Sequence, residues 1–170
     1  MTPTRSMTAA MLEVGMTHEA RLSFSRDEVD RYCALVGDHN AIHRDLDAAR
    51  VRFPDARDII VPGGLVQTRI SALFGTEFPG DGTLGLTFSP ERLRRPLYPG
   101  DELVVTLEVA RLIRGGIVEM QIGIADPEGN RVSEARAKVV APDAAYRAWW
   151  EANIGAEAKS PVAEASRGSA

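Results

Sequence analysis

Hydrophobic residues in the N-terminal half of the chain recur mainly at helical spacing. An alternating stretch at residues 18–25 predicts a short strand, and an amphipathic helix is expected directly after it. Ser25 and Glu28 fit a capping box at the start of this helix, and Gly37 fits the position just past its last turn. The apolar face of the predicted helix is formed by Val29, Tyr32, Cys33 and Val36.

Two further helices are expected before the middle of the chain. A short one is predicted around residues 46–53, with Asp45 as its N-cap. The next begins at the glycine-rich sequence Pro62-Gly63-Gly64, and Gly75 is a candidate for its end. Its apolar positions follow helical spacing over most of its length, which predicts a largely buried helix: Val66, Ile70, Leu73 and Phe74.

The second half of the chain alternates with a period of two. Three stretches at 101–112, 117–126 and 131–140 read as long strands, and turn-forming residues separate them. Strands joined by tight turns favour an antiparallel sheet. With the buried helix packed on one face, the prediction is an α+β fold in which one helix lies across a curled sheet. A C-terminal helix at 144–154 is also expected, with Trp149 and Trp150 as packing groups.

Composition narrows the class of protein. The chain has 170 residues, 44% hydrophobic and 26% charged, which is typical of one globular domain. A formal net charge of -4 disfavours nucleic acid as a partner. The single cysteine, Cys33, favours a reducing cytoplasm, and we expect neither a membrane span nor a signal peptide. The predicted domain covers 12–154, between a flexible N-terminus at 1–11 and a disordered tail at 155–170.

Candidate chemistry is concentrated in the sequence GDHNAIH, residues 37–43, just past the first predicted helix. One interpretation is an ordinary polar helix end, in which Asp38 and Asn40 satisfy turn backbone groups. A second is a metal site that uses Asp38, His39 and His43. The sequence disfavours it, because no other His or Cys cluster exists and the spacing matches no standard zinc signature.

The third interpretation is an acid–base pair formed by Asp38 and His43. The two residues are five apart across a turn, so both side chains can reach one point, and Asn40 can hold the loop. Positioned proton transfer of this kind typically contributes about 10²–10⁴ in rate. The glycine-led helix adds to this interpretation, since unpaired N–H groups at Gly63 can polarise a carbonyl oxygen. The alternative for these glycines is close packing at the helix start.

The motif Asp38-His39-Asn40-Ala41-Ile42-His43 resembles the MaoC-like dehydratase family, which includes the (R)-specific enoyl-CoA hydratases. The family motif is Asp-x-Asn-Pro-(Ile or Leu)-His. The stretch IVPGGLVQTRISALFG is similar to the family's Ile-(Val or Ala)-His-Gly-Met-Leu segment at the start of its central helix. RRPLYPGDEL is similar to the family's Pro-Val-x-x-Gly-Asp segment. The resemblance spans roughly residues 12–141.

This resemblance implies a hot dog fold, an antiparallel sheet wrapped around a central helix, and a homodimer or dimer of dimers. It implies that Asp38 and His43 act around one water and that Asn40 supports their loop. Gly63, with Gly64, would donate to a thioester carbonyl. Ser71 would assist from the central helix.

The sequence departs from the family pattern at several positions. Ala41 replaces the proline of the motif, and Pro62 replaces the histidine before the helix glycine. Arg69 is an unusual charge within a central helix. The stretch at 84–96 differs from the family's usual strand, and Pro90 is incompatible with a central strand.

The basic side chains Arg92, Arg94 and Arg95 are candidate contacts for coenzyme A phosphates, because arginine suits bidentate phosphate binding. The alternative is a solvated basic face.

The expected activity is reversible hydration of a trans-2-enoyl thioester, carried by coenzyme A or acyl carrier protein, to a 3-hydroxyacyl thioester. We expect no metal or redox cofactor, since coenzyme A is part of the substrate. Two alternatives remain: a non-catalytic acyl-thioester-binding subunit, and a hot dog thioesterase. A thioesterase would need its acid or base on the central helix, whose polar side chains include no carboxylate.

Overall fold

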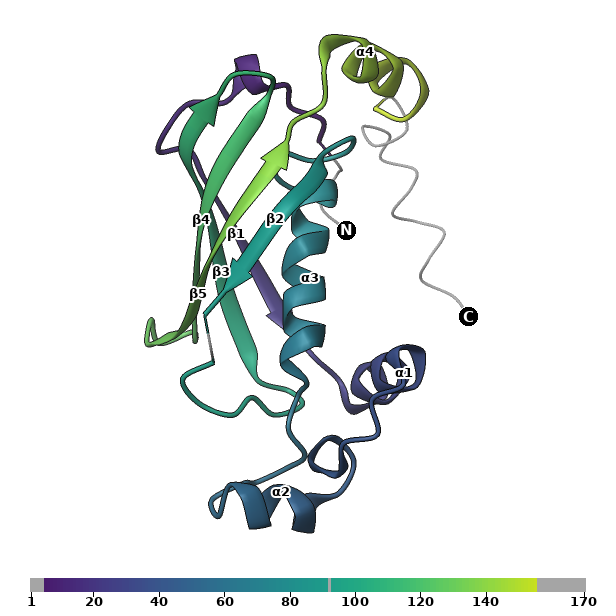
Figure 1. Ribbon diagram of the computed structural model, residues 1–170, viewed down its shortest axis with the longest axis vertical. Helices are drawn as coiled ribbons and strands as arrows, with labels where there is room; N and C mark the ends of the chain where they lie inside the picture. The colour runs from purple at the N-terminus through teal and green to yellow at the C-terminus, as the bar shows by residue number, and fades with distance from the viewer. Residues whose placement is uncertain (1–4, 92, 156–170) are drawn as a thin grey trace, which may run out of the picture.

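The computed structural model describes residues 5–91 and 93–155 (Figure 1). Five strands form one antiparallel sheet, in the order β1-β3-β4-β5-β2. Its strands are β1 (Thr17–Ser23), β2 (Leu84–Pro90), β3 (Glu102–Ile113), β4 (Ile117–Ala125) and β5 (Arg131–Val140). The helices are η1 (Ala9–Met11), α1 (Arg26–Val36), η2 (Ala41–His43), α2 (Leu46–Arg52), α3 (Gly63–Thr76) and α4 (Ala144–Asn153).

The central helix α3 lies along the inner face of the sheet, as Figure 1 shows. Inward-facing residues of the strands alternate with outward-facing ones, so β3 places Leu103, Val105 and Leu107 in the core. From α3, Ile70 and Phe74 are buried in the same hydrophobic cluster. The predicted α+β architecture, with one helix across a sheet, is therefore confirmed.

The stretch 84–90 is a strand, and it lies at an edge of the sheet. β2 pairs with β5 and with no other described strand, and Pro90 is its last residue. A proline is tolerated there because its missing N–H removes no ladder bond from the sheet interior. The sequence predicted that Pro90 is incompatible with a central strand, and the strand that contains it is an edge strand.

Two details of the helices differ from expectation. α3 continues through Gly75 to Thr76, and Glu77 is its C-cap. In α4, Trp150 is buried but Trp149 is about half exposed, so one of the two tryptophans packs against the fold. The capping box of α1 is present as predicted, with Ser25 and Glu28 each accepting a bond from the other's main-chain N–H.

The chain before residue 12 contacts the domain where it is described. Ser6 is buried and forms an isolated bridge with Gly80, and the N–H of Met7 donates to the carbonyl of Pro79. The domain boundary at residue 12 stays a prediction. A disordered tail was predicted at residues 155–170. Of these, residues 156–170 lie outside the described residues, as does Arg92.

The helical segments α1, η2 and α2 lie together at the N-terminal end of α3, beyond the sheet (Figure 1). Short main-chain bonds connect this region to the central helix. The N–H of Ile60 donates to the carbonyl of Ile42, and the N–H of Val61 donates to the carbonyl of Leu97. The segment before α3 is therefore fixed both to the η2 turn and to the loop before β3.

Candidate active site

Asp38 is positioned by the end of α1. Gly37 adopts a left-handed conformation, with φ 69°, which a side chain would disfavour. The N–H of Asp38 then donates to the carbonyl of Cys33 at 2.9 Å, closing the helix end. The chain therefore leaves the helix at Gly37, and the segment that begins with Asp38 starts at the helix end.

The Asp38 carboxylate is held by the loop that it begins. Its Oδ1 accepts a hydrogen bond from the main-chain N–H of Asn40 at 2.9 Å. This is an Asx-type turn, in which a side chain substitutes for a backbone acceptor. The backbone of Asn40 thus contacts Asp38, while its exposed side chain makes no hydrogen bond within the described residues.

His43 lies in η2 and is 8% exposed. Its Nδ1 is 2.7 Å from the carbonyl oxygen of Ile60, and a carbonyl can only accept, so Nδ1 carries the hydrogen. Nε2 therefore faces the other way, 3.7 Å from Oδ2 of Asp38. This separation exceeds a direct hydrogen bond, and one water oxygen can contact both atoms.

The η2 turn forms without the family's proline. Ala41 accepts main-chain bonds from Arg44 at 3.0 Å and from Asp45 at 2.9 Å, and the N–H of His43 donates to Asn40. Arg44 also donates from its guanidinium to the carbonyl of Asp38. These contacts hold the turn, so Ala41 does not displace His43 from Asp38.

The N-terminus of α3 follows soon after this contact, since Gly63 is three residues after Ile60, whose carbonyl binds His43. Pro62 is the N-cap and offers no side-chain cap; its carbonyl accepts from Leu65 and Val66. The N–H groups of Gly63 and Gly64 have no partner within residues 5–91 and 93–155. Unpaired N–H groups with the partial positive charge of a helix start form a preorganised site for a carbonyl oxygen.

Ser71 forms no hydrogen bond to Asp38 or His43 within the described residues. It lies eight residues beyond Gly63, roughly 12 Å along the helix axis, and its side chain is exposed in the single chain. Thr68 is closer to the helix start, and its hydroxyl donates to the carbonyl of Gly64 at 2.8 Å. Arg69 lies 3.8 Å from a carboxylate oxygen of Glu28, which connects α3 to α1.

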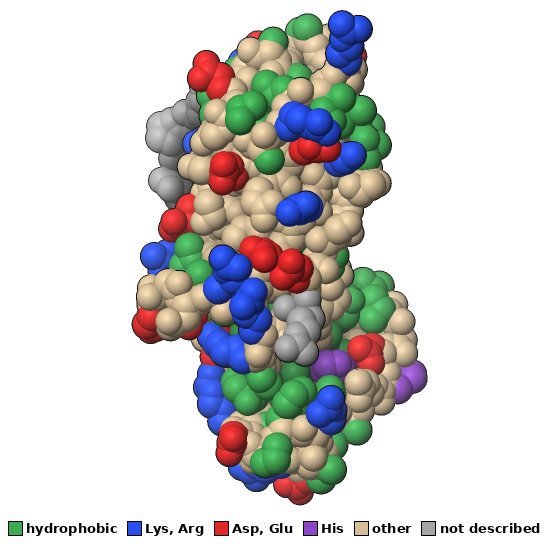
Figure 2. Space-filling view, turned by 60° about the vertical axis from the view of Figure 1, so that its left-hand side comes forward, with side chains coloured by type: hydrophobic (Ala, Val, Ile, Leu, Met, Phe, Trp, Pro, Cys, Tyr) green, Lys and Arg blue, Asp and Glu red, His purple; other side chains and the backbone are tan. Residues whose placement is uncertain are grey.

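The two described arginines of the basic cluster differ in their surroundings. Arg95 lies 3.5 Å from carboxylate oxygens of both Asp101 and Asp126. Arg94 has an exposed side chain that contacts no carboxylate in the described part of the chain. In Figure 2, several Lys and Arg side chains gather in the lower half of the view, and histidine side chains are visible on the same face.

Cys33 is a packing residue. Burial raises the pKa of its thiol, and the nearby Asp38 carboxylate raises it further. The thiol is therefore protonated at neutral pH and poorly suited to nucleophilic attack. No group of three or more His, Cys, Asp or Glu side chains that could hold a metal ion occurs among residues 5–91 and 93–155. No helix in these ranges is long and apolar enough to cross a membrane.

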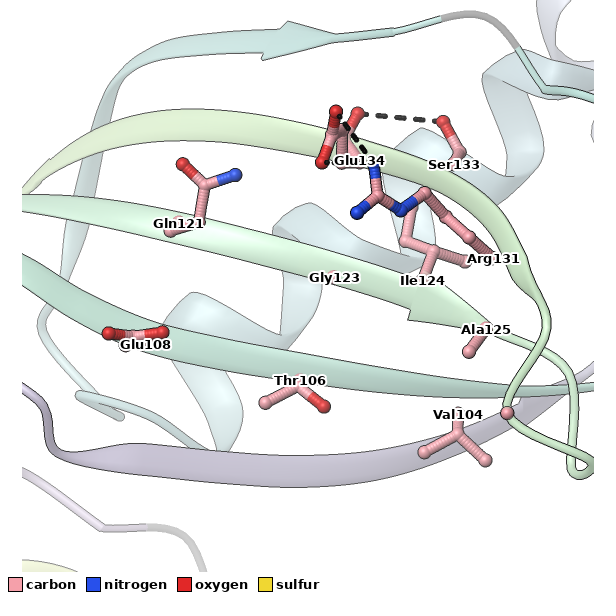
Figure 3. A pocket seen from close by; sticks show the side chains of 11 residues that line it. Val104, Thr106, Glu108, Gln121, Gly123, Ile124, Ala125, Arg131, Ser133 and Glu134 are labelled. Atoms are coloured by element: carbon pink, nitrogen blue, oxygen red, sulfur yellow. Dashed lines mark hydrogen bonds and ion pairs between the residues drawn. The ribbon is translucent and has the colours of Figure 1, made fainter.

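The outer face of the sheet carries a separate hollow of about 320 Å³ (Figure 3). Thr106, Gln121 and Glu134 line it, together with Arg131, which forms an ion pair with Glu134. Strand side chains alternate between faces, so these residues point away from α3. None of the predicted site residues lines this hollow.

Two groups that position the pair were not among the sequence predictions. The carbonyl of Ile60 orients His43, and Arg44 binds the carbonyl of Asp38. Every residue has a backbone carbonyl, so the amino-acid sequence does not show which one binds His43. Arg44, directly after the motif, could have been considered as a neighbouring cation.

The chain is similar to several known proteins. The (R)-specific enoyl-CoA hydratase of Aeromonas caviae is 37% identical over 108 residues, which cover 62% of this chain and 77% of the relative. The 3-hydroxybutyryl-CoA dehydratase of Methylorubrum extorquens is 35% identical over 103 residues, 60% of this chain and 63% of the relative. The structure of the unliganded R-hydratase PhaJ1 from Pseudomonas aeruginosa superposes with a TM-score of 0.75, at 31% identity. It covers 82% of this chain and 88% of that one.

No protein-family model matches the chain. The sheet order, the central helix and the likeness to the R-hydratase structure define a hot dog fold of the hydratase class. The chain belongs to the MaoC-like dehydratase family, in the branch of the (R)-specific enoyl-CoA hydratases.

Proposed function

We propose that this chain adds water reversibly across the double bond of a trans-2-enoyl-CoA, giving a 3-hydroxyacyl-CoA. The observation that carries the proposal is the pairing of Asp38 and His43 across 3.7 Å, next to unpaired N–H groups at the start of α3. The names of the two curated relatives support a coenzyme A thioester as the substrate.

The pair divides the addition of water into two proton transfers. A water bound between the two side chains gives a proton to Asp38 as its oxygen bonds to C3 of the substrate. The electron pair of the double bond moves toward the thioester. His43, which enters this step as an imidazolium with hydrogens on both Nδ1 and Nε2, delivers the Nε2 proton to C2. Return of the Asp38 proton to His43 restores the starting state. One hydrogen and one hydroxyl have then been added.

The start of α3 acts on the charge that develops at the thioester oxygen. As C3 is attacked, that oxygen takes on enolate character, and the N–H of Gly63 or Gly64 donates to it. Preorganised donors are most effective where charge appears in the transition state. Glycine at these positions lets the thioester approach the backbone closely.

Within the same chemistry, Arg94 is proposed as a phosphate contact of coenzyme A. Leu93 supports this, because its side chain lies 4.0 Å from the position that a Cβ on Gly63 would take, which brings this segment to the helix start. Arg95 is already neutralised by two carboxylates. Arg92 lies outside the described residues.

Two other functions predict different products. A thioesterase releases free coenzyme A, and a non-catalytic subunit only binds the thioester. The experiment incubates the protein with crotonyl-CoA and follows both loss of enoyl absorbance and release of thiol. Loss of absorbance without thiol supports hydration. Thiol release indicates a thioesterase, and binding without either change indicates a binding subunit.

We infer that two copies associate along β2, as a homodimer or as half of a dimer of dimers. β2 is an edge strand on which Leu84 is 65% exposed and Leu86 is 51% exposed. An exposed apolar edge of this kind pairs readily with another strand. Light scattering should give about twice the 18.4 kDa chain mass for a homodimer, or about four times that mass for a dimer of dimers, and Leu86→Arg should lower the mass of the assembly. A monomeric wild-type protein would contradict this inference.

We also propose that residues 12–154 form one hot dog domain, which contains all the proposed site residues. The free, buried thiol of Cys33 is consistent with work in the reducing cytoplasm.

A further inference from the structure

Tyr32 of α1 lies against the start of the central helix. A Cβ built on Gly64 would stand 3.4 Å from Cζ of Tyr32, and the phenol oxygen lies closer still, in the space such a Cβ would need. Glycine at position 64 therefore allows the Tyr32 hydroxyl to approach the α3 backbone. The approach is specific to this glycine, because at Gly63 the nearest atom belongs to Leu93.

The Tyr32 ring is fixed while its hydroxyl is uncommitted. The ring packs on the main hydrophobic cluster beneath α1 and is partly buried. The hydroxyl forms no hydrogen bond within residues 5–91 and 93–155. A phenol in such a position usually finds a hydrogen-bond partner. Here the nearby backbone at Gly64 has an unpaired N–H, as has Gly63 directly before it.

The same short distance brings the hydroxyl near the Gly64 nitrogen. A Cβ lies about 2.5 Å from the nitrogen of its own residue, so the Tyr32 oxygen is within roughly 5 Å of the Gly64 nitrogen. Two donors at this separation can point at one acceptor, because a hydrogen bond to each spans about 2.7–3.0 Å. A carbonyl oxygen bound at the helix start can therefore accept from both.

We propose that Tyr32 is a further catalytic residue, whose hydroxyl donates a hydrogen bond to the thioester carbonyl oxygen beside the N–H groups of Gly63 and Gly64. The inference rests on the proposed hydration. It makes the carbonyl site a three-donor site, built from α1 and α3. The α1 helix then supplies both ends of the reaction: Tyr32 at the thioester oxygen, and Asp38, just past its C-terminus, at the water.

The first test compares Tyr32→Phe with Tyr146→Phe. Each variant loses one phenol oxygen, but Tyr146 bonds to Asp81 and lines a separate hollow that includes none of the site residues. With crotonyl-CoA, Tyr32→Phe should lower kcat about tenfold with little change in KM, because two backbone donors remain. Tyr146→Phe should keep the wild-type kcat. An unchanged kcat in Tyr32→Phe would overturn the proposal and leave the hydration intact.

The second test reads the carbonyl directly. Crotonyl-CoA labelled with ¹³C at the thioester carbonyl is bound to Asp38→Asn, and difference infrared spectroscopy records the stretching frequency. The proposal expects a shift to lower frequency that is partly lost when Tyr32→Phe is added. The same shift in both proteins would overturn it.

This spectroscopic test also separates the two proposals. A wild-type protein that binds crotonyl-CoA without hydrating it refutes the hydration, and the carbonyl shift still decides the role of Tyr32. A protein that binds no acyl-CoA refutes both.

A steric check comes from Gly64→Ala. Its methyl group would overlap the Tyr32 oxygen, so the ring must move and kcat should fall in the wild-type background. Added to Tyr32→Phe, the same substitution should cost much less, since the overlapping atom is gone. Equal losses in both backgrounds would contradict the contact.

Discussion

Nδ1 of His43 donates a hydrogen bond to the main-chain oxygen of Ile60, at 2.7 Å. This bond connects the η2 turn to the segment that begins the central helix, 17 residues further along the chain. It also fixes the ring, so that Nε2 alone faces Asp38. One backbone contact therefore determines which nitrogen of His43 faces Asp38, and in the proposed mechanism this nitrogen exchanges protons with the substrate.

The first prediction concerns the tautomer of His43. In ¹⁵N-histidine-labelled protein above the titration range of the ring, Nδ1 should show the chemical shift of a protonated nitrogen and Nε2 that of an unprotonated one. The reason is that the Ile60 carbonyl can only accept. His39, which is exposed and whose Nδ1 lies 2.8 Å from an Arg44 nitrogen, provides the contrasting signal. A neutral His43 protonated on Nε2 would refute the proposed orientation.

The second prediction separates the backbone of Asn40 from its side chain. Asn40→Ala keeps the N–H that donates to Asp38 and should retain most of the activity. Asn40→Pro removes that N–H, while the φ of −64° at this position already suits proline. Its kcat should fall by about ten- to a hundredfold, because the loss of one charge-assisted hydrogen bond costs roughly 1.5–3 kcal/mol. Thermal unfolding of both variants provides the control for folding.

A larger loss in Asn40→Ala than in Asn40→Pro would show that the amide side chain carries the function. The carboxylate would then be held by a contact other than the backbone bond described here.

The third prediction distinguishes two neighbouring arginines. Arg94→Ala should raise KM for crotonyl-CoA several-fold and weaken its dependence on salt, since a free guanidinium is removed from a phosphate. Arg95→Ala should chiefly lower the Tm, because its guanidinium neutralises Asp101 and Asp126. Steady-state kinetics at two salt concentrations and a thermal melt measure both effects. The reverse assignment, with KM changed by Arg95→Ala alone, would contradict the structure-based distinction.

Local signals in the sequence predicted much of the fold. The Ser25 capping box, the left-handed Gly37 and the glycine-led start of α3 depend on residues within one or two turns of each other. The alternation of β3, β4 and β5 likewise reflects which face of each strand is buried. These features are determined by backbone geometry and side-chain polarity over short distances, so a pattern along the chain can predict them.

Contacts between distant segments could not be predicted in this way. The sequence offered Arg94 and Arg95 together as candidate phosphate contacts, but Asp126, 31 residues after Arg95, distinguishes them in the folded chain. The bond from His43 to Ile60 uses a backbone carbonyl, which every residue has. Ser71 matched a family position by its residue type, and it lies about two turns along α3 from the Gly63 end. Its assisting role stays a prediction.

The most direct test of the acid–base pair is the rate of crotonyl-CoA hydration by Asp38→Asn and His43→Gln. Both substitutions nearly preserve side-chain volume, and His39→Gln is the matched control, since it removes the neighbouring imidazole outside the pair. Far-UV circular dichroism and Tm verify that each variant is folded. We expect Asp38→Asn and His43→Gln each to lose about 10²–10⁴ in kcat, and His39→Gln to stay near the wild-type rate. Folded Asp38→Asn and His43→Gln proteins that both hydrate crotonyl-CoA at near wild-type rates would contradict the account.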